Sequence, residues 1–206
     1  MSCSVTRIIQ IFSASDPGEM LTEAVLRNDA WLPCFLADSN IIPAGPAPYH
    51  SGSVLAHTAR CMSDVAGDPL AVWMSMVHDA GKLTTPKALW PHHYGHELRG
   101  ASLAAEWARI LKLPEEYKLA GTLSALLHMR AGRYARLRTG KKYDLLCTVA
   151  ASGFFESFWK VVDADTKSSI SERAMADWKR VNVLPCDGMT PERERQRAIA
   201  ILTSRA

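Results

Sequence analysis

The sequence predicts an all-α protein, and three observations lead to that fold class. Apolar side chains recur at helical spacing in successive segments, helix-starting residues precede several of these segments, and no segment alternates clearly enough to be a strand. The chain has 206 residues, of which 48% are hydrophobic and 22% charged, so it is long enough for one domain with an extension. It has no apolar run long enough to cross a bilayer and no convincing signal peptide. We therefore expect a cytoplasmic protein that does not bind a membrane.

The first quarter of the chain predicts two short helices and a proline-rich connection. Residues 4–13 have helical spacing, and Asp16 with Pro17 starts a second helix. Residues 32–53 hold four prolines, which exclude a regular helix there. We therefore treat residues 1–52 as a helical lead-in with a proline-rich connection.

The middle of the chain predicts the helical core. Ser53 caps a helix that runs to about Ala66, and residues 67–69 end it and start the next one. That helix, residues 70–80, is apolar on nearly every side, which predicts a central, fully packed position. A long connection rich in histidine and aromatic residues follows at 82–99, in which we expect His92 and His93 to order the loop.

Helical spacing returns after this connection. It predicts helices over 101–113 and from Pro114 to His128, another from about Lys142, an amphipathic one over 170–183 and a polar one over 191–202. We divide the chain into a core at 53–165 and a C-terminal helical extension at 166–206, within one compact domain.

Cysteines do not predict a metal knuckle or a disulfide framework. The chain has five of them, with no CxxC spacing: Cys3, Cys34, Cys61, Cys147 and Cys186. We expect reduced cysteines with packing roles.

Residues able to bind a metal lie near the ends of several predicted helices. They are His57, His78, Asp79, His96, His128 and Asp144. Mixed imidazole and carboxylate ligation suits Mn, Fe, Co, Ni or Zn better than Ca or Mg. The sequence therefore predicts a site for one divalent transition metal ion, with a second ion as an option.

The order of these residues resembles the HD superfamily of metal-dependent phosphohydrolases, which are all-helical domains. More closely, His78-Asp79-Ala80-Gly81-Lys82 followed by the string Leu89-Trp90-Pro91-His92-His93-Tyr94-Gly95-His96-Glu97 resembles the HD domain of bacterial CCA-adding tRNA nucleotidyltransferases. The similarity runs over about residues 16–165. It implies an HD-domain helical bundle.

The resemblance also implies roles for individual residues. His57, His78, Asp79 and Asp144 would bind the metal, with Asp163 and Asp165 as alternatives to Asp144. Lys82 would neutralise charge on phosphoryl oxygens. His96 and His128 would bind a second metal or act as acid and base.

A phosphoric ester hydrolase is the function that this resemblance implies. Its substrate would be a nucleotide or an RNA-end phosphate, such as a 2′,3′-cyclic phosphate or a 2′-nucleotide. The nucleotidyltransferase head, with its paired carboxylates and glycine-rich loop, is absent from this sequence, so we do not expect this chain to add CCA.

Two further interpretations stay open. A basic segment contains Arg130, Arg133, Arg136, Arg138, Lys141 and Lys142, and it could bind phosphate or RNA, including tRNA. The protein would then be an HD-like RNA-binding module with weak catalysis. A dimerising structural domain is the third interpretation, and the sequence leaves the oligomeric state open.

Overall fold

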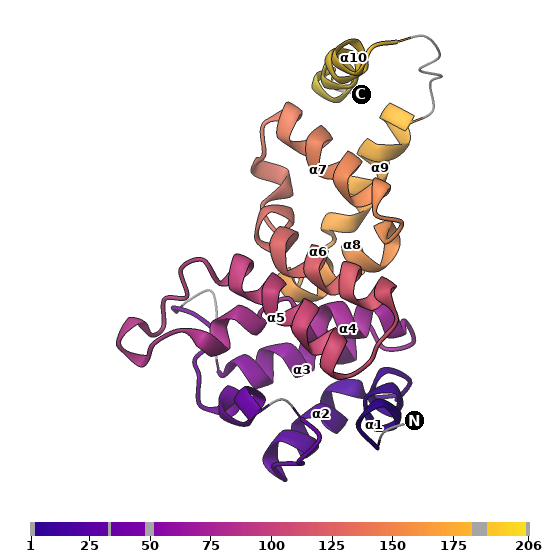
Figure 1. Cartoon of the computed structure of the whole chain (residues 1–206). Coiled ribbons are helices and arrows are strands. Elements are labelled where there is room, and N and C mark those ends of the chain that lie inside the picture. The colour runs from indigo at the N-terminus through magenta and orange to yellow at the C-terminus, as the bar shows by residue number, and fades with distance from the viewer. Residues whose placement is uncertain (1–2, 33, 48–51, 183–188, 205–206) are drawn as a thin grey trace.

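A computed structural model describes residues 3–32, 34–47, 52–182 and 189–204, and it confirms the all-α fold class (Figure 1). Within that part of the chain it has ten α-helices, four short 3₁₀ helices and no strand, apart from an isolated bridge between Pro43 and Ser53. None of the helices in these ranges is long and apolar enough to span a membrane.

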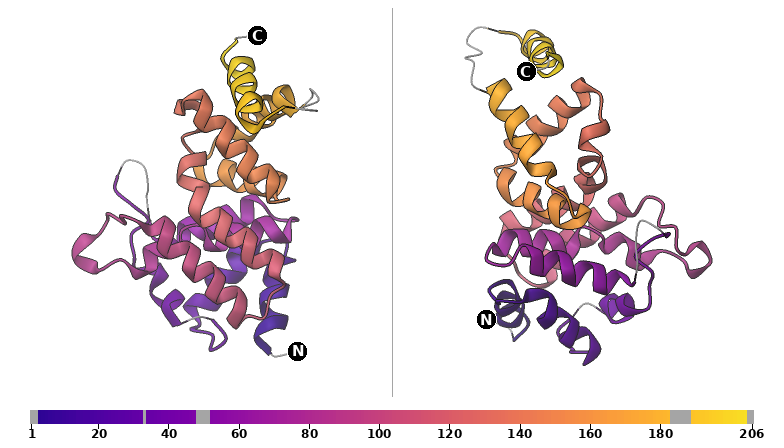
Figure 2. Two further views of the ribbon diagram at one scale, coloured as in Figure 1. Left: turned by 45° about the horizontal axis from the view of Figure 1, so that its top comes forward. Right: turned by 180° about the vertical axis from the view of Figure 1, so that it is seen from behind.

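Two short helices form one end of the molecule (Figure 2). These are α1 (Cys3–Phe12) and α2 (Pro17–Leu26). Asp16 caps α2 as expected, because its carboxylate accepts a hydrogen bond of 2.9 Å from the backbone N–H of Glu19. The 3₁₀ helix η1 (Cys34–Asn40) then leads through the proline-rich connection to the core.

The core is organised around α4 (Pro69–Val77), as its apolar sequence predicted. Trp73, Met74 and Val77 on this helix are fully buried. Helix α4 packs against α3 (Val54–Asp64), α6 (Glu115–Ala131) and α8 (Phe155–Thr166), and α6 packs along α5 (His96–Ile110). The preceding helix α3 and the later helices α6 and α8 therefore surround the segment that ends in His78-Asp79.

Helix boundaries differ from the sequence prediction by a few residues, and a glycine explains the largest difference. Helix α5 begins at His96 and not at residue 101, because Gly95 takes the left-handed conformation (φ +68°) that turns the chain into the helix. Gly153, also at positive φ, separates α7 (Thr139–Ala151) from α8. The earlier start of α5 brings His96 into a helix terminus.

The remaining helices extend the bundle away from α1. Helix α9 (Ile170–Asn182) packs against α8, and α10 (Pro191–Thr203) packs on α7 and α9 at the far end in Figure 1. Arg180 ties α10 to α9 by donating hydrogen bonds to the carbonyl oxygens of Ile201 and Ser204, at 2.6 and 2.7 Å. The division at residue 165 stays a prediction.

Candidate metal centre

Imidazole and carboxylate side chains from five helical elements meet in the interior of the core. The cluster contains His57 from α3, His78 and Asp79 after α4, His96 at the start of α5, His128 from α6 and Asp165 from α8. The first five of these are buried, and the Asp165 side chain is 13% exposed. Five of the six residues were predicted site residues and Asp165 was an alternative to Asp144, and the structure brings all six together.

A close backbone contact places Asp79 against α5. The 3₁₀ helix η2 (Ala80–Thr84) follows Asp79 directly. A Cβ atom at Gly81 would collide with the carbonyl oxygen of His96 and lie 2.6 Å from the backbone nitrogen of Gly100. Only glycine allows this approach, and the approach sets the spacing between Asp79 and His96.

Backbone carbonyls orient three of the four imidazoles. The Nδ1 atoms of His78, His96 and His128 lie 2.7, 2.8 and 3.0 Å from the carbonyl oxygens of Ser75, His93 and Ala125. A carbonyl oxygen can only accept, so Nδ1 carries the proton in each ring and donates it. In its neutral form, each ring therefore presents the lone pair of Nε2 to the cluster, as metal-ligating histidines do.

The first group of donors surrounds His57. Its Nε2 atom lies 3.1 Å from His78 Nε2, 3.2 Å from Asp165 Oδ1 and 3.8 Å from the Sγ atom of Cys61. One donor atom from each of these four residues lies within 4.8 Å of every other.

The second group is a nearly equilateral triangle. Asp79 Oδ1 lies 3.4 Å from His96 Nε2 and 3.5 Å from His128 Nε2, and these two nitrogens are 3.3 Å apart. The other carboxylate oxygen of Asp79, Oδ2, lies 3.3 Å from His57 Nε2 and 3.4 Å from His78 Nε2. Asp79 therefore faces both groups, one oxygen to each.

Asp79 Oδ1 is the observation that tests whether these residues fit a metal. This oxygen is buried and has no hydrogen-bond donor among the described residues, although it belongs to a carboxylate. Leaving a charged buried oxygen unpaired is costly, and a cation between it and the two Nε2 lone pairs would remove that cost. The residues fit a divalent transition metal, because they combine imidazole and carboxylate donors.

The charges of the cluster support one another. Burial raises the pKa of Asp79, but Lys82 and His78 outweigh this effect and hold the pKa well below its usual range. Burial likewise lowers the pKa of His78, and the carboxylates of Asp79 and Asp165 reverse this and raise it to about 10. Without metal, His78 is thus an imidazolium paired with the carboxylates of Asp79 and Asp165. Metal binding at His78 would displace one proton of this imidazolium.

This chain is similar to multifunctional CCA proteins. It is 29% identical to one from Legionella pneumophila over 157 residues, which are 71% of this chain and 38% of that protein. It is 32% identical over 105 residues to one from Xylella fastidiosa, and 35% identical over 104 residues to one from Alkalilimnicola ehrlichii, which are 25% and 24% of those proteins. The chain thus spans less than two-fifths of the length of these multifunctional CCA proteins. No family model and no solved structure matches it.

Asp144 does not belong to the cluster, and this corrects the sequence prediction. Its carboxylate lies on α7 and accepts a hydrogen bond of 2.9 Å from Arg195 Nε. Asp165, which the sequence had left as an alternative, occupies the cluster, while Asp163 accepts a hydrogen bond of 2.9 Å from the backbone N–H of Ser171. The reason is packing, because α8 lies against α3 and α4.

Arg60 fixes the end of α8 that carries Asp165. This residue of α3 donates a hydrogen bond of 2.6 Å to the carbonyl oxygen of Ala164 and one of 3.4 Å to that of Asp165. A cation near the last carbonyls of a helix is favourable. The sequence did not single out Arg60 and predicted only a packing role for Cys61, although Cys61 follows His57 by one helical turn, a spacing that places both on one face.

Lys82 is buried beside Asp79. Its Nζ donates hydrogen bonds to Asp79 Oδ2 and to the carbonyl oxygen of Ala44, at 2.6 and 2.7 Å. Lys82 thus orients Asp79 and holds the proline-rich connection over the cluster. Its contact with a phosphate stays a prediction.

Two further sets of predicted residues lie outside the cluster. His93 orders its loop, since its ring nitrogens lie 3.0 Å from Thr85 Oγ1 and 2.8 Å from the carbonyl oxygen of Pro43. Arg130, Arg133 and Arg136 are exposed, and none forms an ion pair with another described residue.

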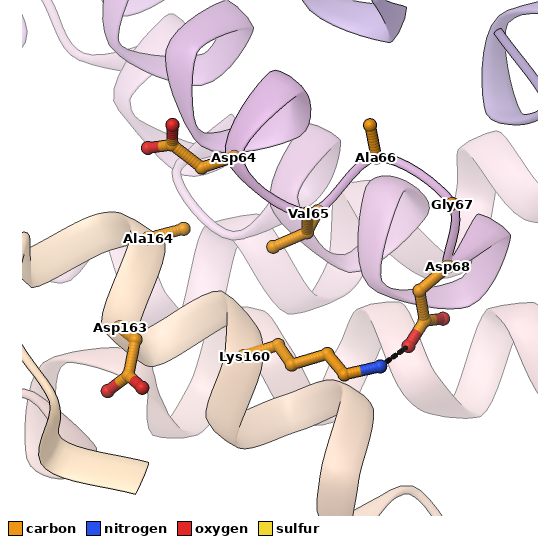
Figure 3. Close-up of a pocket in the computed structure, with 8 residues that line it drawn as sticks. All are labelled: Asp64, Val65, Ala66, Gly67, Asp68, Lys160, Asp163 and Ala164. Carbon is orange, nitrogen blue, oxygen red and sulfur yellow. Dashed lines mark hydrogen bonds and ion pairs between the residues drawn. The ribbon is translucent and has the colours of Figure 1, made fainter. Parts of the chain in front are cut away.

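A surface depression of about 600 Å³ lies between the α3–α4 turn and α8 (Figure 3). The charged groups around it already have partners: Lys160 forms an ion pair of 2.8 Å with Asp68, and Asp64 one of 2.9 Å with Arg60. None of the six cluster residues lines it. The depression is therefore separate from the buried cluster.

Proposed function

We propose that this protein is a metal-dependent phosphohydrolase of the HD type that acts on a nucleotide or an RNA-end phosphate. The observation that carries this proposal is the triangle of Asp79 Oδ1, His96 Nε2 and His128 Nε2, with its buried, unpaired carboxylate oxygen. Three protein donors leave coordination positions for water and substrate, which is the arrangement of catalytic and not of structural metal sites.

The ligand assignment follows the two groups. His57, His78 and Asp165 would hold one ion, His96 and His128 a second, and Asp79 would contact both. Divalent ions in such a site polarise phosphoryl oxygens and lower the pKa of water toward neutrality. We favour a ligand role for His96 and His128 over an acid–base role, because their Nδ1 protons are held by carbonyls and their Nε2 atoms both face Asp79.

The substrate class rests on two lines of support. The relatives named multifunctional CCA proteins align with up to 71% of the length of this chain. This similarity favours an RNA-related phosphate as the substrate and, among RNAs, the end of tRNA. Two cationic groups also lie at the cluster: buried Lys82 at its edge and partly buried Arg60 beside His57. A 2′,3′-cyclic phosphate or a 2′-nucleotide is the substrate that we would test first.

Hydrolysis by metal-loaded protein tests the proposal. The metal-free protein is loaded in turn with Mn²⁺, Fe²⁺, Co²⁺, Ni²⁺ and Zn²⁺, and release of product is followed from nucleoside 2′,3′-cyclic phosphates, 2′- and 3′-nucleotides and a p-nitrophenyl phosphodiester. We expect activity with at least one ion, and a loss of at least about 100-fold in Asp79→Asn, because oriented charge in a site typically contributes that much.

His92→Ala is the matched control, since His92 is an exposed histidine of the same region and should keep wild-type activity. Wild-type protein that holds metal but hydrolyses no member of the panel would show that the proposal is wrong.

A second candidate function is favoured by the unpaired arginines. Arg130, Arg133 and Arg136 follow the cluster residue His128 and are exposed without an ion-pair partner among the described residues, so they are free to bind phosphates. In this case the protein binds tRNA without hydrolysing it.

The test is RNA binding at several salt concentrations. Replacing Arg133 and Arg136 by Gln should lower the slope of log affinity against log salt by roughly 1.4, at about 0.7 per lost contact to single-stranded RNA. Asp79→Asn, which leaves this surface unchanged, should bind RNA as the wild type does. RNA binding that is equal in all three proteins contradicts this role for the arginines.

A further inference from the structure

Cys61 is a buried thiol that points into the first group of donors. It lies four residues after His57 on α3, and its Sγ atom is 3.8 Å from His57 Nε2. The side chain is fully buried. The sequence had predicted only a packing role for it, yet its neighbours are the polar groups of the cluster.

The distances in this group match those around a single ion. Two donors bound to one tetrahedral zinc ion at about 2.0–2.3 Å are separated by roughly 3.3–3.6 Å. The separations from His57 Nε2 to His78 Nε2, Asp165 Oδ1 and Cys61 Sγ are 3.1, 3.2 and 3.8 Å. His78 Nε2 and Asp165 Oδ1 are 3.7 Å apart. All four donors can therefore reach one ion with only small movements.

We propose that Cys61 is a metal ligand, so that His57, His78, Asp165 and Cys61 form a four-donor site for a borderline or soft divalent ion. Coordination joins the sulfur to the ion, and the thiol proton passes to solvent. The inference rests on the metal centre of the proposed function, but not on the hydrolytic reaction.

Burial and the carboxylate of Asp165 raise the pKa of the Cys61 thiol, and Arg60 opposes them, so a bound ion would displace the thiol proton. Arg60 Nη2 lies 3.4 Å from Cys61 Sγ and donates a hydrogen bond to it. A guanidinium next to sulfur stabilises its anionic form. The same Arg60 holds the end of α8, so one residue positions both Asp165 and the thiolate.

A thiolate ligand gives the two groups of donors different metal preferences. Sulfur favours Zn²⁺, Co²⁺ and Fe²⁺ over Mg²⁺, Ca²⁺ and Mn²⁺, whereas the triangle of Asp79, His96 and His128 has only oxygen and nitrogen donors. These four donors, with Asp79 Oδ2 beside them, leave the first ion no open position, whereas the three donors of the triangle leave a position open at the second ion. The first group would therefore hold its ion firmly and the second would be the exchangeable, substrate-facing one.

Cobalt spectroscopy tests the inference without any enzymatic readout. The metal-free protein is titrated with Co²⁺, and the near-ultraviolet thiolate-to-cobalt charge-transfer band is recorded. We expect this band in the wild type and in Cys147→Ser, and its loss in Cys61→Ser. Cys147 is the matched control, because it is the other free cysteine among the residues with described side chains and lies on α7, outside the cluster.

Metal affinity gives a second readout on the same proteins. We expect the affinity of Cys61→Ser for Zn²⁺ to fall by about tenfold or more, since even the loss of an outer-shell partner costs 10–100-fold. The affinity for Mn²⁺ should change far less. Equal losses for both ions would indicate general damage and contradict a sulfur ligand.

X-ray absorption at the zinc edge of the wild type keeps the inference testable if Cys61→Ser does not fold. A sulfur scatterer at about 2.3 Å is expected. Bound metal without sulfur overturns the role of Cys61 and leaves the proposed function standing. Sulfur-ligated metal in a protein that hydrolyses nothing supports Cys61 and overturns the hydrolase. Protein that binds none of the five ions tested for hydrolysis overturns both, and protein that binds Mn²⁺ or Ni²⁺ but neither Co²⁺ nor Zn²⁺ overturns only the role of Cys61.

Discussion

Asp165→Asn is the change that distinguishes the carboxylate of the cluster from the one expected from the sequence. The substitution keeps the shape of the side chain and removes its charge. Asp165 Oδ1 lies 3.2 Å from His57 Nε2 and 3.7 Å from His78 Nε2, so the variant loses an anionic donor from the first group. We expect weaker metal binding, with the fold kept.

The size of the effect follows from ligand chemistry. Loss of an outer-shell partner costs about 10–100-fold in metal affinity, and the loss of a direct ligand should be at least as large. This corresponds to roughly 1.4–2.7 kcal/mol. Asp144→Asn breaks surface ion pairs with Arg195 and Lys141, which contribute little to stability, and should leave metal affinity unchanged.

The assay is calorimetric titration of metal-free wild type, Asp165→Asn and Asp144→Asn with Zn²⁺. Circular dichroism of the metal-free proteins checks that all three are folded. The assignment is refuted if Asp165→Asn binds Zn²⁺ as tightly as the wild type, and the sequence prediction is restored if Asp144→Asn is the variant that loses affinity.

Three other predictions concern the groups that support the cluster. Gly81→Ala should lower the free energy of unfolding by about 1–3 kcal/mol, measured by urea denaturation, because its Cβ would meet backbone atoms of α5; wild-type stability would show that this contact is loose. Lys82→Met should destabilise the metal-free protein by roughly 3–5 kcal/mol, since the buried carboxylate of Asp79 would lose its nearest cation, and Zn²⁺ should restore part of this loss. Equal losses with and without Zn²⁺ would contradict it. Burial raises the pKa of Asp68, but its hydrogen bonds, above all the one from Lys160, lower the pKa overall. The Asp68 carboxylate therefore stabilises the fold above pH 3.8, and this contribution is lost as the pH falls through the folded-state pKa. The difference in unfolding free energy between wild type and Asp68→Asn, measured at pH 7 and pH 3, should therefore shrink at the lower pH, and a constant difference would refute this.

Local patterns account for the parts of the structure that the sequence predicted well. The caps of α2, α3 and α4 come from Asp16, Ser53 and Asp68, which lie next to the helices that they start. The central place of α4 followed from its apolar residues on every side. The sequence predicted the start of a helix less accurately where the conformation of a glycine sets it, as at Gly95 before α5.

The donors of the cluster were predicted to different degrees for a physical reason. His57, His78, Asp79, His96 and His128 stand in a family-like order near helix ends, and this order is visible along the chain. Cys61 was assigned to packing because no CxxC spacing marks it, although the His-x-x-x-Cys spacing on one helix is a local signal.

The sequence by itself determined the helices and most of the donor side chains, because both depend on spacing over a few residues. The tertiary structure alone decided which carboxylate closes the cluster and which thiol faces it. Asp144 and Asp165 follow similar helical patterns, and only the packing of α8 on α3, held by the hydrogen bonds from Arg60 to residues more than one hundred positions away, brings Asp165 to His57. The position of Asp79 against α5 likewise depends on tertiary packing, because it requires the backbone at Gly81 to approach the backbone at Gly100.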